Sequence, residues 1–335
     1  DLFKFVSQHY KKVWVLVLFV CLIYKKGKFP IVAFLQSLFH SKISIDKVKI
    51  KAFNLLSINE FKYSNDIDVL IPTIGRKEPL YNFLKNLSKQ TILPKNVIII
   101  EQNPIANAAS ELDYLVNENW PFQIKHQLIY QLGACNARNL ALKEIVSDWV
   151  FFADDDIEIK SDFLEKCLEN AKKYKQQVFS LSCLLRNEKK YFTTCFQWVT
   201  FGTCSSFVNI NAVKNLEFGA KYEFGFGEDA DYGMQIRNNG NDVIYLPTPE
   251  IIHLKAPMGG FRTKIVKKWD NDVIEPKPSP TVMVYKLTYD SEEQLFAFKL
   301  MLFFRMYTIK KFKNPISHYK TMTKRWNRSV YWAQK

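Results

Sequence analysis

The sequence lacks the cysteine spacing that is typical of zinc-binding and disulfide-stabilised proteins. Its six cysteines include no C-x-x-C pair, so neither a zinc site nor a disulfide framework is indicated. We expect reduced cysteines in the core of a cytosolic protein. Glycine and proline are also scarce, at 11 and 13 of 335 residues, which is too few for a disordered low-complexity chain. Because 47% of the residues are hydrophobic, the chain can form one large α/β domain with additions, or two domains.

The apolar run Val13–Ile23 falls short of a membrane span. It has 11 residues and lies between lysine pairs, whereas a transmembrane helix needs about 20 residues. No small-residue cleavage site follows it, as a signal peptide would require. We favour a helix that packs in the core or lies at a membrane interface, with a membrane-anchor fragment or a partner-binding helix as the alternatives.

Acidic residues are few at both ends of the chain, whose net charge is +14. Residues 1–65 contain 11 Lys and Arg against 3 Asp and Glu, and residues 262–335 contain 16 against 6. The stretch between them is therefore slightly acidic. Basic ends of this kind indicate a nucleic-acid contact, an anionic membrane surface or a solvated face.

Strands and helices alternate in the first part of the central stretch. We expect strands at 67–71, 96–100, 123–129 and 149–153, with helices around 80–87, 107–118 and 134–144 between them. This alternation predicts an α/β fold with a parallel sheet. After that, we expect a helix at 161–175, strands at 178–185, 190–199, 204–210 and 242–246, a turn at 247–249, and a helix ending at Gly240. The proline-rich segment 276–280 indicates a linker, and a largely apolar helix is expected over 291–313.

Three consecutive carboxylates, Asp154, Asp155 and Asp156, follow the apolar strand Trp149–Ala153. Three adjacent acids cannot all ionise cheaply unless a cation lies among them. In an open parallel sheet, ligands bind just beyond the carboxyl ends of the strands, which is where this triplet is expected. The alternative is an acidic turn, since Asp is common in turns.

Other polar segments follow the expected strands or open the expected helices. In chain order they are Pro72-Thr73-Ile74-Gly75-Arg76, Glu101-Gln102-Asn103, Gly133–Asn139, the Asp triplet, Gly227-Glu228-Asp229-Ala230-Asp231, and His253 followed by a Gly-Gly loop. This series resembles family 2 glycosyltransferases over about residues 66–262. The resemblance implies an α/β fold of the GT-A type, with a mainly parallel central sheet flanked by helices and with helical N- and C-terminal extensions. It implies a catalytic domain at 66–262, a basic helical N-terminal extension at 1–65, and a linker with a basic amphipathic helical region at 263–335.

The resemblance also implies a metal-dependent transfer with inversion. A departing diphosphate must have its charge neutralised, and Mn²⁺ or Mg²⁺ held by carboxylate oxygens does this. Asp154 and Asp156 match the family's D-x-D motif, with Asp156 favoured as the direct ligand and His253 as a third ligand. Asp155 is expected at the ribose. The alternative for His253 is a histidine satisfied within the core or a loop.

Inversion requires a base that removes the proton of the acceptor hydroxyl. Asp229 matches the family's base, at the start of a helix whose N-terminus favours the ionised form, and Glu228 is expected to orient the acceptor. The alternative is a cluster of helix-capping acids.

The nucleotide site that the resemblance implies includes residues from four of these segments. Pro72, Thr73 and Arg76 follow the first strand, and Glu101, where the family more often has Asp, follows the second. Arg138 is expected to reach the base or a phosphate, with a helix-surface arginine as the alternative. Gly259, Gly260 and Arg262 are expected to form a loop that closes over the phosphates.

The Q-x-x-R-W signature of processive family members is absent, because Met322 stands where Gln precedes Arg325–Trp326. We therefore expect transfer of one sugar per encounter, from a UDP-sugar to a glycan or lipid-linked glycan in bacterial cell-surface polysaccharide assembly. The basic ends are expected to hold the enzyme at the cytoplasmic face of the membrane, with no nucleic-acid partner. The alternatives are a sugar-1-phosphate nucleotidyltransferase, a basic nucleic-acid- or membrane-binding module, and an inactive scaffold.

Overall fold

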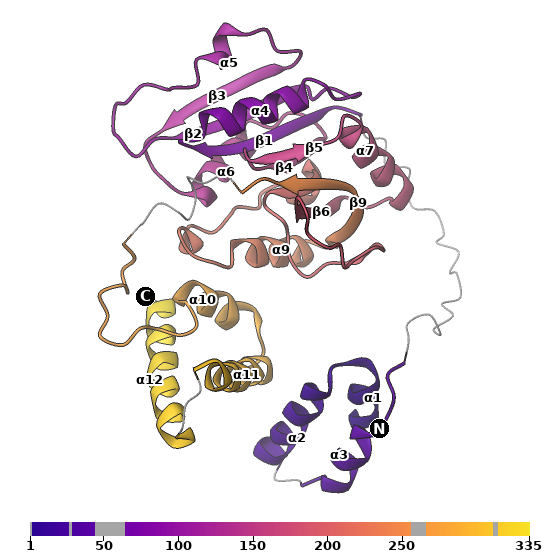
Figure 1. Ribbon diagram of the computed structural model, residues 1–335, viewed down its shortest axis with the longest axis vertical. Coiled ribbons are helices and arrows are strands. Elements are labelled where there is room, and N and C mark those ends of the chain that lie inside the picture. Colours follow the sequence, from indigo (N-terminus) through magenta and orange to yellow (C-terminus); the bar gives the residue numbers. More distant parts are fainter. Residues whose placement is uncertain (1, 27–28, 44–63, 256–265, 311–313) are drawn as a thin grey trace. The chain divides into compact units, whose positions relative to one another are not determined.

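The computed structural model describes residues 2–26, 29–43, 64–255, 266–310 and 314–335 (Figure 1). The chain divides into two compact units. We call residues 61–285 with 327–335 the sheet unit, and residues 1–60 with 286–326 the helical unit. The division of the sequence at 65/66 and 262/263 stays a prediction.

The described part of the sheet unit contains one nine-stranded sheet in the order β3-β2-β1-β4-β8-β6-β9-β5, with β7 paired to β9. The strands are β1 (Ile67–Ile74), β2 (Asn96–Gln102), β3 (Gln123–Ile129), β4 (Trp149–Ala153), β5 (Ile157–Ile159), β6 (Val178–Leu185), β7 (Phe196–Gln197), β8 (Ser205–Asn209) and β9 (Ile244–His253). Six of them, β1 to β4, β6 and β9, run in the same direction. The expected mainly parallel α/β architecture is confirmed.

Helices cover both faces of this sheet (Figure 1). They are α4 (Lys77–Leu87), α5 (Tyr114–Asn117), α6 (Ala134–Lys143), α7 (Phe163–Tyr174), α8 (Ile210–Val213), the short 3-10 helix η2 (Ala220–Tyr222) and α9 (Glu228–Asn238). The apolar residues of α4 and α7 pack with Val69 and Val97, whereas those of α6 and α9 pack with Leu70 and Ile98. Successive strand residues thus face opposite layers, which explains why β1 and β2 are continuous apolar runs.

The sheet curls because of the short link between β4 and β5. Only Asp154–Asp156 join these strands, although β8, β6 and β9 lie between them in the sheet. Four strand spacings span about 19 Å in a flat sheet, whereas a three-residue link reaches at most about 14 Å. The curl therefore brings β5 back towards β4, and β5 pairs with β9 so that Ile157 lies opposite His253.

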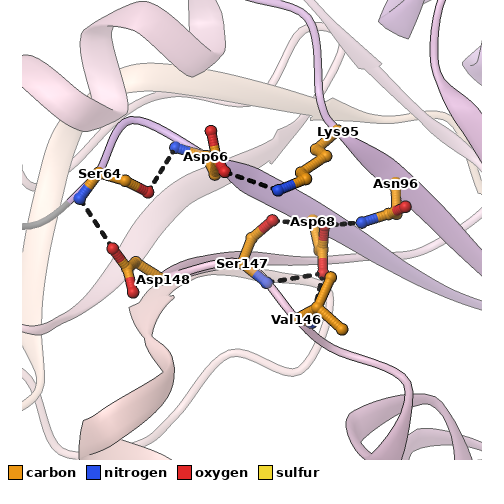
Figure 2. Close-up of polar contacts among 8 residues, drawn as sticks. All are labelled: Ser64, Asp66, Asp68, Lys95, Asn96, Val146, Ser147 and Asp148. Atoms are coloured by element: carbon orange, nitrogen blue, oxygen red, sulfur yellow. Dashed lines mark hydrogen bonds and ion pairs between the residues drawn. The ribbon is translucent and has the colours of Figure 1, made fainter.

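A buried carboxylate, Asp68, organises the amino end of the parallel strands (Figure 2). It is 0% exposed and accepts four hydrogen bonds. The donors are Asn96 Nδ2 at 2.7 Å, Val146 N at 2.8 Å, Ser147 N at 3.1 Å and Ser147 Oγ at 2.7 Å. Asp68 therefore joins the starts of β1 and β2 to the segment that enters β4.

Three expectations for the secondary structure are wrong. The helix expected over 107–118 is reduced to α5, and Asn107 at the start of the expected segment has a positive φ of 63°, which lies outside helical geometry. The strand expected over 190–199 is reduced to β7. The turn expected at 247–249 is a bulge within β9, where the register against β6 shifts between Leu181 and Ser182.

The helical unit contains α1 (Leu2–His9), α2 (Lys12–Lys26), α3 (Ile31–Leu38), α11 (Glu292–Lys310) and the first part of α12 (Pro315–Gln334), while α10 (Pro280–Tyr289) spans the boundary. Lys12 Nζ donates hydrogen bonds to Ser37 O at 3.1 Å and His40 O at 2.7 Å, which links α2 to the end of α3. Residues 44–63 lie outside the described residues. Among the described helices, none combines the length and apolar content that a bilayer crossing requires.

Candidate active site

The Asp triplet lies at the carboxyl end of β4 and next to the last residue of β9. Ligand atoms of Asp154, Asp156 and His253 all lie within 4.8 Å of one another. His253 Nε2 lies 3.4 Å from Asp156 Oδ1, and this nearby carboxylate raises the pKa of His253. Two carboxylates and one imidazole at this spacing form a donor set that suits Mn²⁺ or Mg²⁺. The three residues therefore fit a divalent cation.

The middle member of the triplet, Asp155, is held by β1 and the turn after it. It accepts hydrogen bonds from Thr73 Oγ1 at 2.6 Å and from Arg76 Nη1 at 2.5 Å. Burial raises the pKa of Asp155 to about 6, against the opposing effects of Arg76 and Thr73. Arg76 Nη1 also lies 3.3 Å from Asp156 Oδ2, so one guanidinium spans two of the three acids. The expected contact of Asp155 with ribose stays a prediction.

Arg138 in α6 lies near Asp154 of the triplet and interacts with Asp229 of α9. Its side chain is only 7% exposed, and Nη2 lies 3.4 Å from Asp154 Oδ1. Asp154 and Asp229 both raise the pKa of Arg138, against the effect of its burial, which is the largest influence on this group. A helix-surface arginine is therefore excluded. Among the described residues, Arg138 Nε has no hydrogen-bond partner, and a buried donor of this kind can receive a ligand.

Asp229 lies in the first turn of α9 and faces Arg138. The residue keeps some exposed surface, but its Oδ1 atom is inaccessible to solvent and has no hydrogen-bond partner in the described part of the chain. Burial raises the pKa of Asp229, while Arg138 and a hydrogen bond from Thr203 oppose that rise. Burial, with the nearby Asp229 charge, raises the pKa of Glu228 to about 7.

Both carboxylate oxygens of Asp231, the third acid of this segment, accept hydrogen bonds from side chains of the fold. Its Oδ1 accepts a hydrogen bond from Tyr222 Oη at 2.9 Å, and its Oδ2 accepts one from Gln235 Nε2 at 2.7 Å. The N-cap position of α9 is Gly227, which has no side chain to cap the helix. The acids of this segment therefore differ: Asp231 is hydrogen-bonded within the fold, whereas Asp229 Oδ1 has no hydrogen-bond partner among the described residues.

Thr73 and Glu101 lie opposite each other at the carboxyl ends of β1 and β2. Both are buried, and Pro72 is half-buried beside them. Glu101 Oε2 lies 2.8 Å from His126 Nε2 of β3. Sequence reasoning missed His126, because nothing in the alternating pattern of that strand distinguishes it. The expected loop residues Gly259, Gly260 and Arg262 lie outside the described residues.

Glu223 is a second residue that the sequence patterns did not identify. Its Oε1 accepts a hydrogen bond from Asn136 N at 2.6 Å, at the first turn of the helix that carries Arg138. Gly133, with a φ of 144°, precedes that helix, and a Cβ there would lie 2.3 Å from Glu223 Oε1. The glycine is thus required for the carboxylate to reach the helix N-terminus. Gly133 was the only sequence signal that could have indicated this contact.

One known protein family matches part of the chain. The sequence model of glycosyl transferase family 2 matches residues 68–214, a range that contains the Asp triplet and Arg138 but neither Asp229 nor His253. No curated protein matches the sequence significantly.

Solved structures of TarS from S. aureus are similar in fold. TarS 1-349 in complex with UDP-GlcNAc has a TM-score of 0.50 at 17% identity, over 68% of this chain and 68% of that one. TarS 1-349 with UDP has a TM-score of 0.47 at 17% identity, over 56% and 59%. For TarS itself the values are 0.46 and 17%, over 56% of this chain and 36% of that one. The chain thus spans about a third of TarS, and the identity is low enough that the likeness concerns the fold alone.

Proposed function

Residues 68–214 belong to glycosyl transferase family 2, and on that premise we propose that the chain is a metal-dependent, inverting glycosyltransferase. Its donor is a nucleotide-diphospho-sugar, of which a UDP-sugar is the first candidate because similar folds bind UDP and UDP-GlcNAc. Its acceptor is a hydroxyl group of a glycan or lipid-linked glycan, in the assembly of a bacterial cell-surface polysaccharide. It transfers one sugar per encounter.

The observation that carries the proposal is the position of Asp229 relative to the triplet. Arg138 lies within electrostatic reach of both Asp154 and Asp229, so a candidate metal ligand and the candidate base both lie near one guanidinium. A sugar donor needs a charged anchor for its diphosphate and, near the sugar, an acceptor of the hydroxyl proton. This arrangement supports such a reaction.

Each group has a distinct role in the proposed reaction. Asp154, Asp156 and His253 hold the divalent cation, which when bound supplies positive charge to a departing diphosphate. Arg76 and Thr73 fix Asp155 at the end of β1. Asp229 takes the proton from the acceptor hydroxyl as its oxygen attacks the anomeric carbon from the face opposite the diphosphate, which inverts that carbon.

A thermal-shift experiment with UDP, in the presence and absence of Mn²⁺, tests the donor site. At 100 times the Kd, a ligand stabilises the native protein by about 2.7 kcal/mol, so UDP with Mn²⁺ is expected to raise the Tm clearly. UDP alone is expected to have a smaller effect, as is UDP with Mn²⁺ on Asp156→Asn. Asp162→Asn is the matched control, because Asp162 is a half-exposed acid that pairs with Lys166. A UDP effect that is indifferent to Mn²⁺ would contradict the metal role of the triplet.

We also propose that the enzyme lies at the cytoplasmic face of the membrane, and exposed apolar residues of the helical unit support this localisation. Ile31, Val32, Leu35 and Leu38 of α3 are all exposed, with Val32 at 68%, and their spacing aligns them along the helix. The exposed Lys42 follows them, within a segment of strongly positive charge. An apolar stripe beside lysines suits an anionic leaflet.

Co-sedimentation with vesicles tests this localisation. The full chain is expected to sediment with anionic vesicles at low salt and to remain in solution with neutral ones. Replacing both Val32 and Leu35 by Glu is expected to abolish sedimentation, because two charges would enter the apolar stripe. Val116→Glu is the control, since Val116 is 87% exposed but lies in the sheet unit. Equal sedimentation of both variants would remove α3 as the contact.

A further inference from the structure

A buried phenylalanine, Phe218, lies against the side chain of Arg138. The guanidinium carbon Cζ of Arg138 is 5.8 Å from the centroid of the Phe218 ring, which is within the range of a cation–π contact. Phe218 is 2% exposed, so this contact is shielded from solvent. Arg138 Nη2 also lies 3.4 Å from Asp154 Oδ1. The guanidinium therefore contacts an aromatic ring as well as a candidate metal ligand.

The ring of Phe218 also packs against the helix that carries Asp229. The ring centroids of Phe218 and Tyr232 lie 3.9 Å apart and the ring planes differ by 8°, which is a stacked arrangement. Tyr232 is 0% exposed and follows Asp229 by three residues in α9, so the two are neighbours on that helix. Phe152 of β4, two residues before Asp154, contacts the same ring edge-on with centroids 6.2 Å apart. One ring thus contacts α6, α9 and β4.

The backbone of Phe218 is tied to α6 by the side chain of Asn139, the residue after Arg138. Asn139 Nδ2 donates a hydrogen bond to Phe218 O at 2.9 Å, and Phe218 N donates one to Asn139 Oδ1 at 2.8 Å. A carboxamide can do both because it offers a donor and an acceptor. Five residues further on, Glu223 Oε1 accepts a hydrogen bond from Asn136 N at 2.6 Å. The segment that leads into α9 therefore contacts α6 at two points.

We propose that Asn139 and Phe218 are positioning residues that hold the guanidinium of Arg138 where the donor binds. The inference rests on the proposed function, which provides the donor. An arginine side chain has many rotamers, and the ring of Phe218 restricts them. The ring is itself fixed, through its backbone by Asn139 and through its face by Tyr232. Fixed geometry matters because a displacement of about 1 Å near a reacting centre can cost about 100-fold in rate.

Asn139 is the position at which positioning can be separated from folding. It is half-buried and lines a cavity of about 220 Å³, so Asn139→Ala removes two hydrogen bonds while it enlarges an existing space. Asn170→Ala is the matched control. Asn170 Nδ2 donates hydrogen bonds to Lys166 O at 2.8 Å and to Thr248 O at 3.3 Å, on a helix that covers the opposite face of the sheet. If Asn139 served only the fold, both variants would lower stability and neither would affect Arg138.

NMR of the arginine Nε–H groups tests the positioning without a substrate. Arg138 Nε is inaccessible to solvent, so its Nε–H is expected to exchange slowly with water, and its signal is assigned by its absence from Arg138→Lys. We expect exchange to be about tenfold faster in Asn139→Ala and in Phe218→Leu, the second of which keeps an apolar side chain but loses the aromatic ring. We expect no change in Asn170→Ala. Unchanged exchange in either of the first two variants would overturn the proposal.

Calorimetry of UDP binding in the presence of Mn²⁺ tests the consequence for the donor. Asn139→Ala is expected to weaken UDP binding by about tenfold, and Asn170→Ala is expected to leave it unchanged. When Arg138 is already replaced by lysine, Asn139→Ala is expected to cause no further loss, because its effect passes through the guanidinium. Equal losses in the two backgrounds would overturn the proposal. If the wild type bound no UDP, the UDP assignment of the proposed function would fail, and the NMR experiment would still decide whether Asn139 and Phe218 position Arg138.

Discussion

Buried carboxyl groups occur at both edges of the parallel strands, and their surroundings differ. At the amino edge, Asp68 receives four hydrogen bonds from the chain itself (Figure 2). At the carboxyl edge, Asp229 Oδ1 is equally inaccessible but has no partner among the described residues. Since an unpaired buried acceptor costs about 1–3 kcal/mol, the second arrangement weakens the fold. Asp68 is thus bonded entirely within the fold, whereas we propose that Asp229 serves a ligand.

The largest expected effect is the loss of activity in Asp229→Asn. An amide cannot accept the proton of the acceptor hydroxyl, so kcat is expected to fall by about 10²- to 10⁴-fold. The affinity for UDP, measured by calorimetry, is expected to change little, because the proposed donor ligands are elsewhere. Retained turnover would show that Asp229 is not the base. The contrast between Asp68 and Asp229 would then have no functional meaning.

The next effect is on stability, in Asp68→Ala. This change leaves several buried donors without an acceptor, so the free energy of unfolding is expected to fall by about 3 kcal/mol. Turnover per folded molecule is expected to be preserved. Urea unfolding measures the first quantity and a transfer assay the second.

Asp66→Ala is the matched control for that measurement. Asp66 lies on the same edge but pairs with Lys95 while 48% exposed, and exposed pairs contribute about 0–1 kcal/mol. Equal destabilisation by the two variants would show that burial and bonding do not distinguish Asp68.

The smallest effect is a pH-dependent gain in stability in Glu228→Gln. The pKa of Glu228 is raised from its ordinary 4.5 to about 7, so the native state holds this proton more tightly than the unfolded state. Ionisation therefore opposes folding increasingly from about pH 4.5 to about pH 7, and fully above that range. The variant lacks this penalty.

Thermal unfolding at two pH values measures this difference. After allowance for the partial exposure of the group, the variant is expected to exceed the wild type by about 1 kcal/mol at pH 8 and to match it at pH 4. Glu217→Gln, at an exposed position, is expected to show no such change. A gain for Glu228→Gln at pH 4 as large as that at pH 8 would contradict the assigned titration.

The regular elements were predictable where the residue pattern and the burial agree. The bounds of β3 and β6 coincide with the expected 123–129 and 178–185. The prediction of a strand at 190–199 was wrong, because the aromatic residues of this segment form a side-chain cluster instead of a regular strand face. Phe192 and Trp198 pack against each other and against Tyr245 of β9, with ring centroids 5.1–5.8 Å apart, and most of the segment forms no ladder.

Some residues of the candidate site could likewise be predicted from the sequence, and others could not. Polar residues that end strands, such as Thr73 and the Asp triplet, were predictable because parallel strands end at one edge. Glu223 and Thr203 were not, because they come from segments without a periodic pattern. Only tertiary contacts bring them to this edge, and no spacing in the sequence records those contacts.

The three-residue link between β4 and β5 acts as a spacer of fixed length as well as a set of acidic groups. One residue more or fewer would shift every side chain of β5 to the other face of the sheet, and would move Ile157 out of its position opposite His253. The identity of the middle residue can therefore change at the cost of its bonds to Thr73 and Arg76. The number of residues cannot change without separating the histidine from the carboxylates.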